Sequence, residues 1–413
     1  MRALIEAGVE VEVFVIAPLD ASMWEHSLDL LGPTHLPRNR VHHLTLGEAA
    51  RAARPVVRAN FAACRRDSWA VLSAAARHGA VPFGKTAYVL PKAWAWTAEH
   101  AGRFDHVLAY WGNYAGTCAY AFHRLAGENG PGKRSLPFSI WLHAGVDLYR
   151  TPVFLREKLL YADNIITCCE FNQGYIAGMF PDAAGQIGPK VHVCHHGLDL
   201  GHFPFRPEGE RPANRILAVG RLAKHKGFEY LLRAVHLLAA RGEDTTVELV
   251  GGGEEREPLR ALAAELGIAD RLRLRGWLPF PEVRRAMSEA TVLVHPSEGL
   301  GDGLPNVIRE AMALGTPVIA SDVAGIPDAL RDGCGVLVPP RNAEALATAI
   351  AQLMHDPIRR QDIAARARRR TEERYDLWRN GARLADLLQT TRRDQAHAPA
   401  AVAAAIREPS PAC

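Results

Sequence analysis

The stretch that decides the fold is TVLVHPSEGLGDGLPNVIREAMALGTPVIAS, residues 291–321. Its first five residues, 291–295, form a short run rich in β-branched side chains, which predicts a buried strand. Its last five residues, 317–321, form a similar run and predict another strand. Between them, Pro305 suits the first position of a helix, where its missing amide hydrogen is not needed. Gly315 suits the residue just past the helix end, where left-handed backbone is common. The stretch therefore predicts a strand, a helix and a strand, the unit of a parallel α/β sheet.

The same alternation extends on both sides of this stretch. In the second half of the chain we expect further strands at 215–219, 246–250, 272–274 and 335–338. In the first half we expect them at 9–17, 106–110, 138–143, 164–168 and 190–194. Helical patterns lie between them, which predicts parallel sheets covered by helices on both faces. The fold class is therefore α/β, with two tandem doubly wound, Rossmann-like domains and a ligand cleft between the carboxyl ends of their strands.

The boundary between the two domains is placed in residues 199–214, whose three prolines and mixed charges have the composition of a linker. We expect the domains at residues 1–203 and 204–374, the second ending with an arginine-rich helix from about Pro357 to Arg374. A C-terminal helix at 375–390 is expected to cross back to the first domain. The alanine- and proline-rich tail, 391–413, is expected to be disordered.

Composition excludes several classes of protein. The chain has 413 residues, 48% hydrophobic and 23% charged, as soluble globular proteins have, and its net charge of +4 is too small to indicate nucleic acid binding. The seven cysteines show no C-x-x-C spacing, which favours reduced thiols. No apolar run approaches the ~20 residues of a membrane-spanning helix, and no signal peptide pattern opens the chain. We therefore expect a cytoplasmic protein.

The helix that follows Asp302 is the strongest candidate for a binding site. Its first turn, residues 303–306, offers unpaired amides and a positive dipole end to an anion or to hydroxyl groups. Glu310 lies three residues after Val307 and four before Leu314, on an apolar face, so it needs either a structural partner or the hydroxyls of a ligand. Asp302 is either a ligand contact or only a loop or capping residue.

Two more loops of the second domain carry chemistry. Arg221 and Lys226 follow the strand at 215–219 and suit a diphosphate, the alternative being a solvated basic turn. The glycines of Val250-Gly251-Gly252-Gly253-Glu254 allow close approach of a ligand to the backbone but lack the G-x-G-x-x-G order of a dinucleotide site.

The first domain offers only histidines. His143 ends the strand at 138–143, and His195 and His196 end the one at 190–194; a lone histidine is more often structural. Several known motifs are absent from the sequence: the D-x-D metal clamp, the P-loop and the G-x-S-x-G elbow. We therefore expect no metal and no cofactor, with charge stabilised by side chains and helix dipoles.

Taken together, these motifs resemble the family 4 glycosyltransferases of the GT-B fold, in particular the colanic acid, capsule and exopolysaccharide type. The resemblance rests on Val-Gly-Arg-Leu at 219–222 with Lys226-Gly227, on Val-Gly-Gly-Gly-Glu at 250–254, on Arg-Gly-Trp at 275–277, and on His-Pro-Ser followed by residues 302–321. It implies a cytosolic, retaining, metal-independent hexosyltransferase. Such an enzyme would take a nucleotide-sugar donor and a polysaccharide or lipid-linked oligosaccharide acceptor.

The resemblance also implies residue roles, with His143, Asp302 and Glu310 as the catalytic residues. Glu310 would bind the ribose hydroxyls, Asp302 the sugar, and His143 would lie near the transferred sugar. Arg221 and Lys226 would hold the diphosphate. The remaining expected contacts to the donor are Gly251, Gly276, Trp277, Leu278, Gly303, Leu304, Pro305 and Asn306. Retention would follow from front-face attack, in which the departing phosphate takes the acceptor's proton.

Two departures from the family pattern matter. Asp302 stands where glutamate is usual, and the family's opening strand and glycine loop should precede the helix that ends at Gly8, where this sequence shows neither. The missing element favours one alternative, a catalytically inactive sugar-nucleotide-binding or scaffold protein. A second alternative is a GT-B phosphorylase or epimerase, which would share the fold. Peripheral membrane contact is a further hypothesis. It rests on Trp94, Trp96 and the arginines of the helix at 358–370, against a tryptophan pair in the core and a solvated helix.

Overall fold

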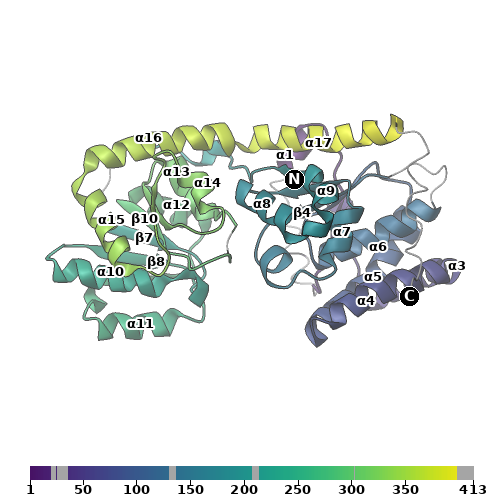
Figure 1. Ribbon diagram of the computed structural model, residues 1–413, viewed down its shortest axis with the longest axis horizontal. Coiled ribbons are helices and arrows are strands. Elements are labelled where there is room, and N and C mark those ends of the chain that lie inside the picture. Colours follow the sequence, from purple (N-terminus) through teal and green to yellow (C-terminus); the bar gives the residue numbers. More distant parts are fainter. Residues whose placement is uncertain (20–24, 26–35, 130–135, 207–213, 302, 398–413) are drawn as a thin grey trace.

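The computed structural model describes residues 1–19, 25, 36–129, 136–206, 214–301 and 303–397. Two α/β domains lie side by side, and the long helices α16 and α17 run along one edge of both (Figure 1). This confirms the predicted fold class of two parallel-sheet domains.

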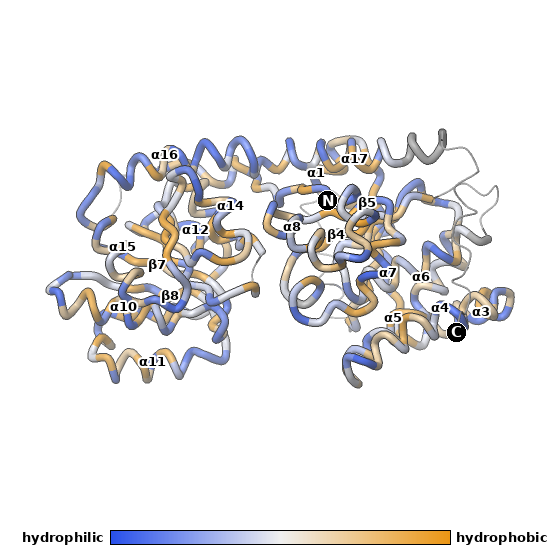
Figure 2. Tube along the Cα trace, in the orientation of Figure 1, coloured by the Kyte–Doolittle hydropathy of each residue, from blue (hydrophilic) through white to orange (hydrophobic). Residues whose placement is uncertain are grey.

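The second domain is built on a six-stranded parallel sheet in the order β12-β11-β10-β7-β8-β9. Its strands are β7 (Arg215–Val219), β8 (Thr246–Val250), β9 (Leu272–Gly276), β10 (Val292–His295), β11 (Val318–Ser321) and β12 (Val336–Val338). Each lies within two residues of the strand that the sequence predicts. The central strands β10 and β11 are buried along their whole length, because helices cover both faces. Figure 2 shows β7 as an apolar stretch inside the domain.

Seven helices of the described residues cover this sheet. They are α10 (Phe228–Ala240), α11 (Arg256–Glu265), α12 (Phe280–Glu289), α13 (Asn306–Leu314), α14 (Ile326–Leu330), α15 (Ala343–His355) and α16 (Pro357–Arg374). Helix α13 begins after Pro305 and ends at Gly315, whose φ of 76° is the left-handed backbone expected there. Helix α16 has the bounds that the sequence predicts.

The first domain has a four-stranded parallel sheet in the order β3-β4-β5-β6. Its strands are β3 (Val107–Ala109), β4 (Phe138–Leu142), β5 (Asn164–Thr167) and β6 (Val191–Val193). Its helices are α1 (Arg2–Glu6), α3 (Leu46–Ala59), α4 (Phe61–Ala76), α5 (Ala80–His100), α6 (Tyr114–Asn129), α7 (Leu155–Tyr161), α8 (Glu170–Met179) and α9 (Ala184–Ile187). The strand expected at 9–17 is shorter, β1 (Val13–Val15). Rather than joining the four strands, it pairs with the unpredicted β2 (Val41–His43) in a separate two-stranded sheet.

Helix α17 (Leu377–His397) packs on the first domain. Leu384 and Leu388 share an apolar cluster with Trp141 of β4 and Ile166 of β5. Leu198 joins the start of this helix, since its amide donates to the Tyr375 carbonyl at 2.7 Å and its carbonyl accepts from Leu377 at 3.0 Å. The helix continues through residues that the sequence assigned to a disordered tail from 391 onward. That part of the prediction is wrong, and residues 398–413 lie outside those described.

The residues behind the membrane hypothesis have structural partners. Trp96 is 3% exposed in the first-domain core, and Trp94 packs against the same core. On α16, the Arg368 guanidinium donates to the carbonyls of Phe203 and Ala313, and Arg370 pairs with Asp332. Among the described residues, no helix is both long and apolar enough to span a bilayer. The two tryptophans belong to the first-domain core, as one of the two interpretations predicted.

Candidate functional site

The loops that carry the predicted donor contacts lie at one edge of the second sheet. Because β10, β7, β8 and β9 are neighbouring parallel strands, their carboxyl ends meet at this edge. At ~4.8 Å per strand, the loops after β10 and β9 are about 14 Å apart. The loop after β10 leads into α13, and the loop after β9 carries Trp277, which is 78% exposed, and Leu278, which packs partly buried on the core. A ligand that contacts both loops must therefore be extended.

Glycines allow these loops to touch through their backbones. The Gly251 amide donates to the Gly276 carbonyl at 2.8 Å, and the Gly220 amide donates to the Val250 carbonyl at 3.0 Å. Gly251 has a φ of +138°, and a Cβ atom there would lie 1.9 Å from the Gly220 carbonyl oxygen. Only glycine fits this close approach, so the loops after β7, β8 and β9 form one continuous backbone surface.

Arg221 and Lys226 lie on the loop between β7 and α10. The Arg221 side chain is 71% exposed and contacts Glu254, of the glycine loop, at 3.2 Å. The pKa of Glu254 is lowered by a hydrogen bond from its own backbone amide and by the one from Arg221. Lys226 ends a short turn, and Gly227 follows at a φ of 66°. An exposed pair such as Arg221 with Glu254 is weak, so the guanidinium can exchange Glu254 for an anionic ligand at little cost.

Helix α13 carries Glu310 and, beside it, an arginine that sequence reasoning overlooked. Burial raises the pKa of the Glu310 carboxyl. Arg309 is 1% exposed, and its guanidinium donates to the carbonyl of His196 in the first domain and to the side chain of Asn306. It also lies over the Tyr375 ring, 5.5 Å from the centroid. Asp302, the predicted sugar contact, lies outside the described residues.

His143 is held on both sides of its ring. Its Nε2 lies 2.8 Å from the Tyr110 carbonyl, so this nitrogen carries the hydrogen, and its Nδ1 lies 2.9 Å from His196 Nε2. The ring is 7% exposed, stacked with Trp141 and flanked by Trp111 at 4.5 Å. Burial and the neighbouring His196 lower the pKa of His143 to about 3. The imidazole is therefore neutral at pH 7.

The two domains meet where His143 faces the loop before α13. A Cβ atom on Gly303 would lie 2.9 Å from the His143 carbonyl oxygen and 3.2 Å from Ala144. One on Gly145 would lie 3.7 Å from the Gly301 carbonyl oxygen. The backbone at His143 in the first domain and that at Gly303 in the second are thus brought together. Leu304 is buried in the core cluster behind this loop, and Pro305 is the residue from which α13 begins.

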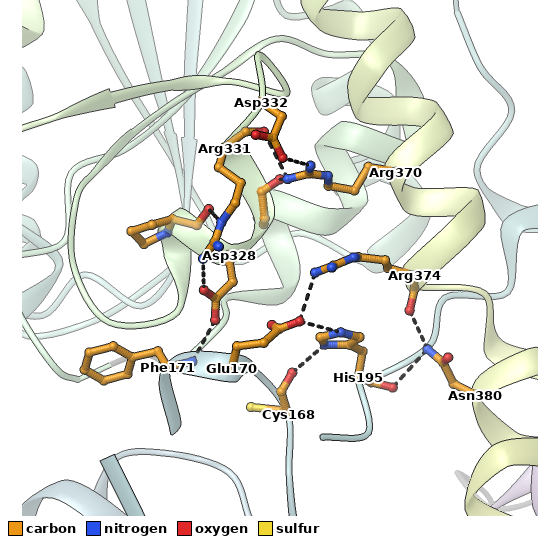
Figure 3. Close-up of polar contacts among 12 residues, drawn as sticks. Cys168, Glu170, Phe171, His195, Asp328, Arg331, Asp332, Arg370, Arg374 and Asn380 are labelled. Carbon is orange, nitrogen blue, oxygen red and sulfur yellow. Dashed lines mark hydrogen bonds and ion pairs between the residues drawn. The ribbon is translucent and has the colours of Figure 1, made fainter. Parts of the chain in front are cut away.

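A polar network joins the domains beside this contact (Figure 3). Asp328 of α14 accepts a hydrogen bond of 2.8 Å from the Phe171 amide in the first turn of α8, so a second-domain carboxylate occupies the start of a first-domain helix. Glu170 pairs with Arg374 at 2.9 Å and lies 3.6 Å from His195. The polar contact with His195 is the largest cause of a Glu170 pKa lowered to about 2. His195 is therefore part of the interdomain contact.

Two buried groups support the loop beneath His143, and neither was found from the sequence. Lys158 is fully buried, and its ammonium donates to the carbonyls of Gly112 and Asn113. Burial lowers its pKa to about 7. Asp147 accepts from the amides of Gly112 and His143 at 3.2 and 3.3 Å. The one sequence signal that could have indicated these two groups was a charged residue on an apolar helical face, as for Glu310.

No group of three or more His, Cys, Asp or Glu side chains that could hold a metal ion occurs within the part of the chain that the structure describes. The six cysteines in that part form no disulfide.

Comparison with known proteins places this site in a family. Residues 205–370 match the family described as "Glycosyl transferases group 1". A GDP-mannose-dependent alpha-(1-6)-phosphatidylinositol monomannoside mannosyltransferase of Mycolicibacterium smegmatis is 31% identical over 57% of this chain and 66% of its own. A putative colanic acid biosynthesis glycosyltransferase, WcaL, of Salmonella typhimurium is 30% identical over 49% of this chain and 51% of its own. The chain thus spans between half and two thirds of these relatives.

Solved structures show the same fold. Sucrose-phosphate synthase of Thermosynechococcus elongatus superposes with a TM-score of 0.59 at 22% identity, over 74% of this chain and 78% of its own. HepE of Anabaena, in complex with UDP, superposes with a TM-score of 0.59 at 20% identity, over 74% of this chain and 82% of its own. The region 205–370 is therefore a domain of the glycosyl transferases group 1 family, in a chain with the two-domain GT-B fold.

Proposed function

We propose that this protein is a retaining, metal-independent glycosyltransferase that moves a hexosyl group from a nucleotide-sugar to a polysaccharide or lipid-linked oligosaccharide. The observation that carries the proposal is the edge of the second sheet, where the glycine-linked loops after β7, β8 and β9 adjoin the loop before α13. The family match over residues 205–370 supports the proposal, and so do the two relatives, a mannosyltransferase and a colanic acid biosynthesis glycosyltransferase.

In this proposal Arg221 and Lys226 hold the diphosphate, and Glu310 binds the ribose hydroxyls. The amides before α13 bind the sugar and the phosphate, since they lie at the positive end of the helix dipole. Asp302 contacts the sugar, and Trp277 lies beside the base. His143, neutral and held on both sides, shapes the sugar pocket without exchanging a proton.

The transfer step needs no protein base. The bond between the anomeric carbon and the phosphate oxygen breaks while the acceptor oxygen attacks from the same face. The acceptor's proton goes to the departing phosphate, whose negative charge Arg221, Lys226 and the helix dipole stabilise. The two domains close over the donor, and the contact between His143 and Gly303 forms part of the closed interface. This closure excludes water from the reacting groups.

The first experiment is thermal unfolding with UDP-, GDP-, ADP- and dTDP-sugars, on the wild type and on Glu310→Gln. Glu344→Gln, an exposed glutamate of α15 paired with Arg241, is the matched control. At 100 times its Kd a ligand adds about 2.7 kcal/mol, so one nucleotide family should raise the midpoint of the wild type and the control but not of Glu310→Gln. A midpoint that no nucleotide-sugar moves would refute the donor site.

A second experiment tests the chemistry with the donor so identified. NMR of the product should show the anomeric configuration of the donor, and activity should persist in EDTA. An inverted product or full dependence on a divalent ion would refute the mechanism. Donor binding with no transfer to any acceptor would instead favour an inactive sugar-nucleotide-binding protein, and products formed without acceptor an epimerase or phosphorylase.

A further inference from the structure

Large apolar side chains lie exposed on one pair of first-domain helices. Helices α4 and α5 form a hairpin on the side opposite α17 in Figure 1. Phe61, Trp69, Val81 and Phe83 on this hairpin are 64%, 76%, 67% and 42% exposed. Single exposed apolar residues are ordinary, but four bulky ones within 23 consecutive residues make this hairpin a candidate interaction surface.

The same region holds the positive charge of the protein. Residues 46–100, from α3 to α5, contain three acidic and eight basic residues, a net charge of +5. Lys92 is buried and donates to the Ile16 carbonyl, and the seven basic residues that are exposed are Arg51, Arg54, Arg58, Arg65, Arg66, Arg77 and Lys85. The whole chain carries +4, so all its other residues together carry −1. The one acidic residue of α4, Asp67, already contacts Arg66 and Arg124. This surface is therefore complementary to an anionic partner.

Apolar and basic residues alternate along one face of α4. Phe61, Arg65 and Trp69 are spaced four residues apart, which places them in a row on the helix, and all three are exposed. Tryptophan and phenylalanine enter the boundary between headgroups and acyl chains, while arginine stays among the phosphates. The pattern fits an anionic bilayer better than a folded acidic protein, whose surface offers no apolar layer of matching depth.

The hairpin leads to the mouth of the cleft. Helix α5 precedes β3 and runs back along the sheet, so its first residues lie at the edge where the parallel strands end. There the Lys85 ammonium lies 5.4 Å from the centroid of the Tyr114 ring, at the start of α6. Three residues earlier, Trp111 is 50% exposed, and its ring lies 4.5 Å from that of His143.

We propose that the α4–α5 hairpin docks on an anionic phospholipid surface, with Trp69, Val81 and Phe83 in the interface and Arg65 and Arg77 among the headgroups. Docking brings the cleft mouth at Trp111 close to the bilayer, where a lipid-linked acceptor would lie. The docking itself does not depend on the proposed transfer reaction, because it is measured without donor or acceptor.

The test is sedimentation with vesicles of phosphatidylcholine alone or with 30% phosphatidylglycerol, at low and high salt. The full chain should sediment with the anionic vesicles, less at high salt, and poorly with phosphatidylcholine. At about fivefold per arginine, Arg65→Gln with Arg77→Gln should weaken binding roughly 30-fold at low salt. Trp69→Ser with Phe83→Ser should weaken it at both salt concentrations.

Matched controls come from α16, the other arginine-rich helix. Arg359→Gln with Arg369→Gln removes the same charge, and Ile358→Ser removes an apolar side chain that is 78% exposed. These variants should bind as the wild type does, and circular dichroism should show every variant folded. Failure of the wild type to sediment, or equal losses in the α16 variants, would overturn the proposal. So would a dimer in solution that Trp69→Ser dissociates, since the surface would then be an interface between two copies.

Discussion

Replacing Arg309 with methionine should destabilise the protein and weaken donor binding together. The buried guanidinium donates to the His196 carbonyl and the Asn306 side chain and lies over the Tyr375 ring. Each hydrogen bond from a charged donor contributes about 1.5–3 kcal/mol, and methionine leaves both acceptors without this partner. Against this, burial opposes the charge and lowers the pKa of Arg309, so removing it recovers part of the loss. We expect a net cost of about 2–4 kcal/mol.

The measurement is urea unfolding followed by circular dichroism, with titration of the nucleotide-sugar identified above. Because Arg309 and Asn306 lie in the first turn of α13, Arg309→Met should raise the Kd of the donor about tenfold. Arg309→Lys keeps the charge but not the planar fork, so it should fall between wild type and Arg309→Met. Arg366→Met removes a surface arginine, 53% exposed and paired with Asp362, and should leave the urea midpoint close to that of the wild type. An Arg309→Met protein as stable as Arg366→Met would refute the reasoning.

Three further predictions concern backbone, pH and the interface. Gly251→Ala should cost about 2 kcal/mol or more in urea unfolding, because its Cβ would lie 1.9 Å from the Gly220 oxygen. Gly252→Ala, with open space around it, should behave as wild type, and equal effects would contradict the account. Burial lowers the pKa of His143 to about 3 and of His106 to about 4 in the folded protein. As the pH falls, both histidines are therefore protonated in the unfolded chain near pH 6.5, before they are protonated in the folded one. Stability should therefore be full above pH 6.5 and fall by about 2 kcal/mol for each histidine at pH 5; a urea midpoint equal at pH 7 and pH 5 would disprove this. Asp328→Ala should cost about 1 kcal/mol and speed amide exchange at the start of α8, unlike Asp362→Ala on the surface of α16; unchanged exchange there would show that the Asp328 contact does not hold the domains.

Local pattern was enough for most of the second domain. Its six strands and α13 were predictable because short β-branched runs, Pro305 and Gly315 act over a few residues. The loop residues Arg221, Gly251 and Gly276 could be placed at one edge as well, because parallel strands point their carboxyl ends the same way. The roles of these residues in binding stay predictions.

Contacts between distant segments were decided only by the tertiary structure. The sequence did not show that Arg309 would reach His196, 113 residues away, or that β1 would pair with β2 outside the main sheet. The sequence left Trp94 and Trp96 open between a membrane surface and the core. It also ended α17 too early, because residues 391–397 were grouped with the alanine- and proline-rich segment that follows them. A repeat of apolar residues predicts which face of a helix is buried, but it does not predict which other segment of the chain covers that face. A buried charge finds its carbonyl partner only when both segments are folded. The hydrogen bond to that partner then offsets the cost of burying the charge, and the local sequence does not specify it.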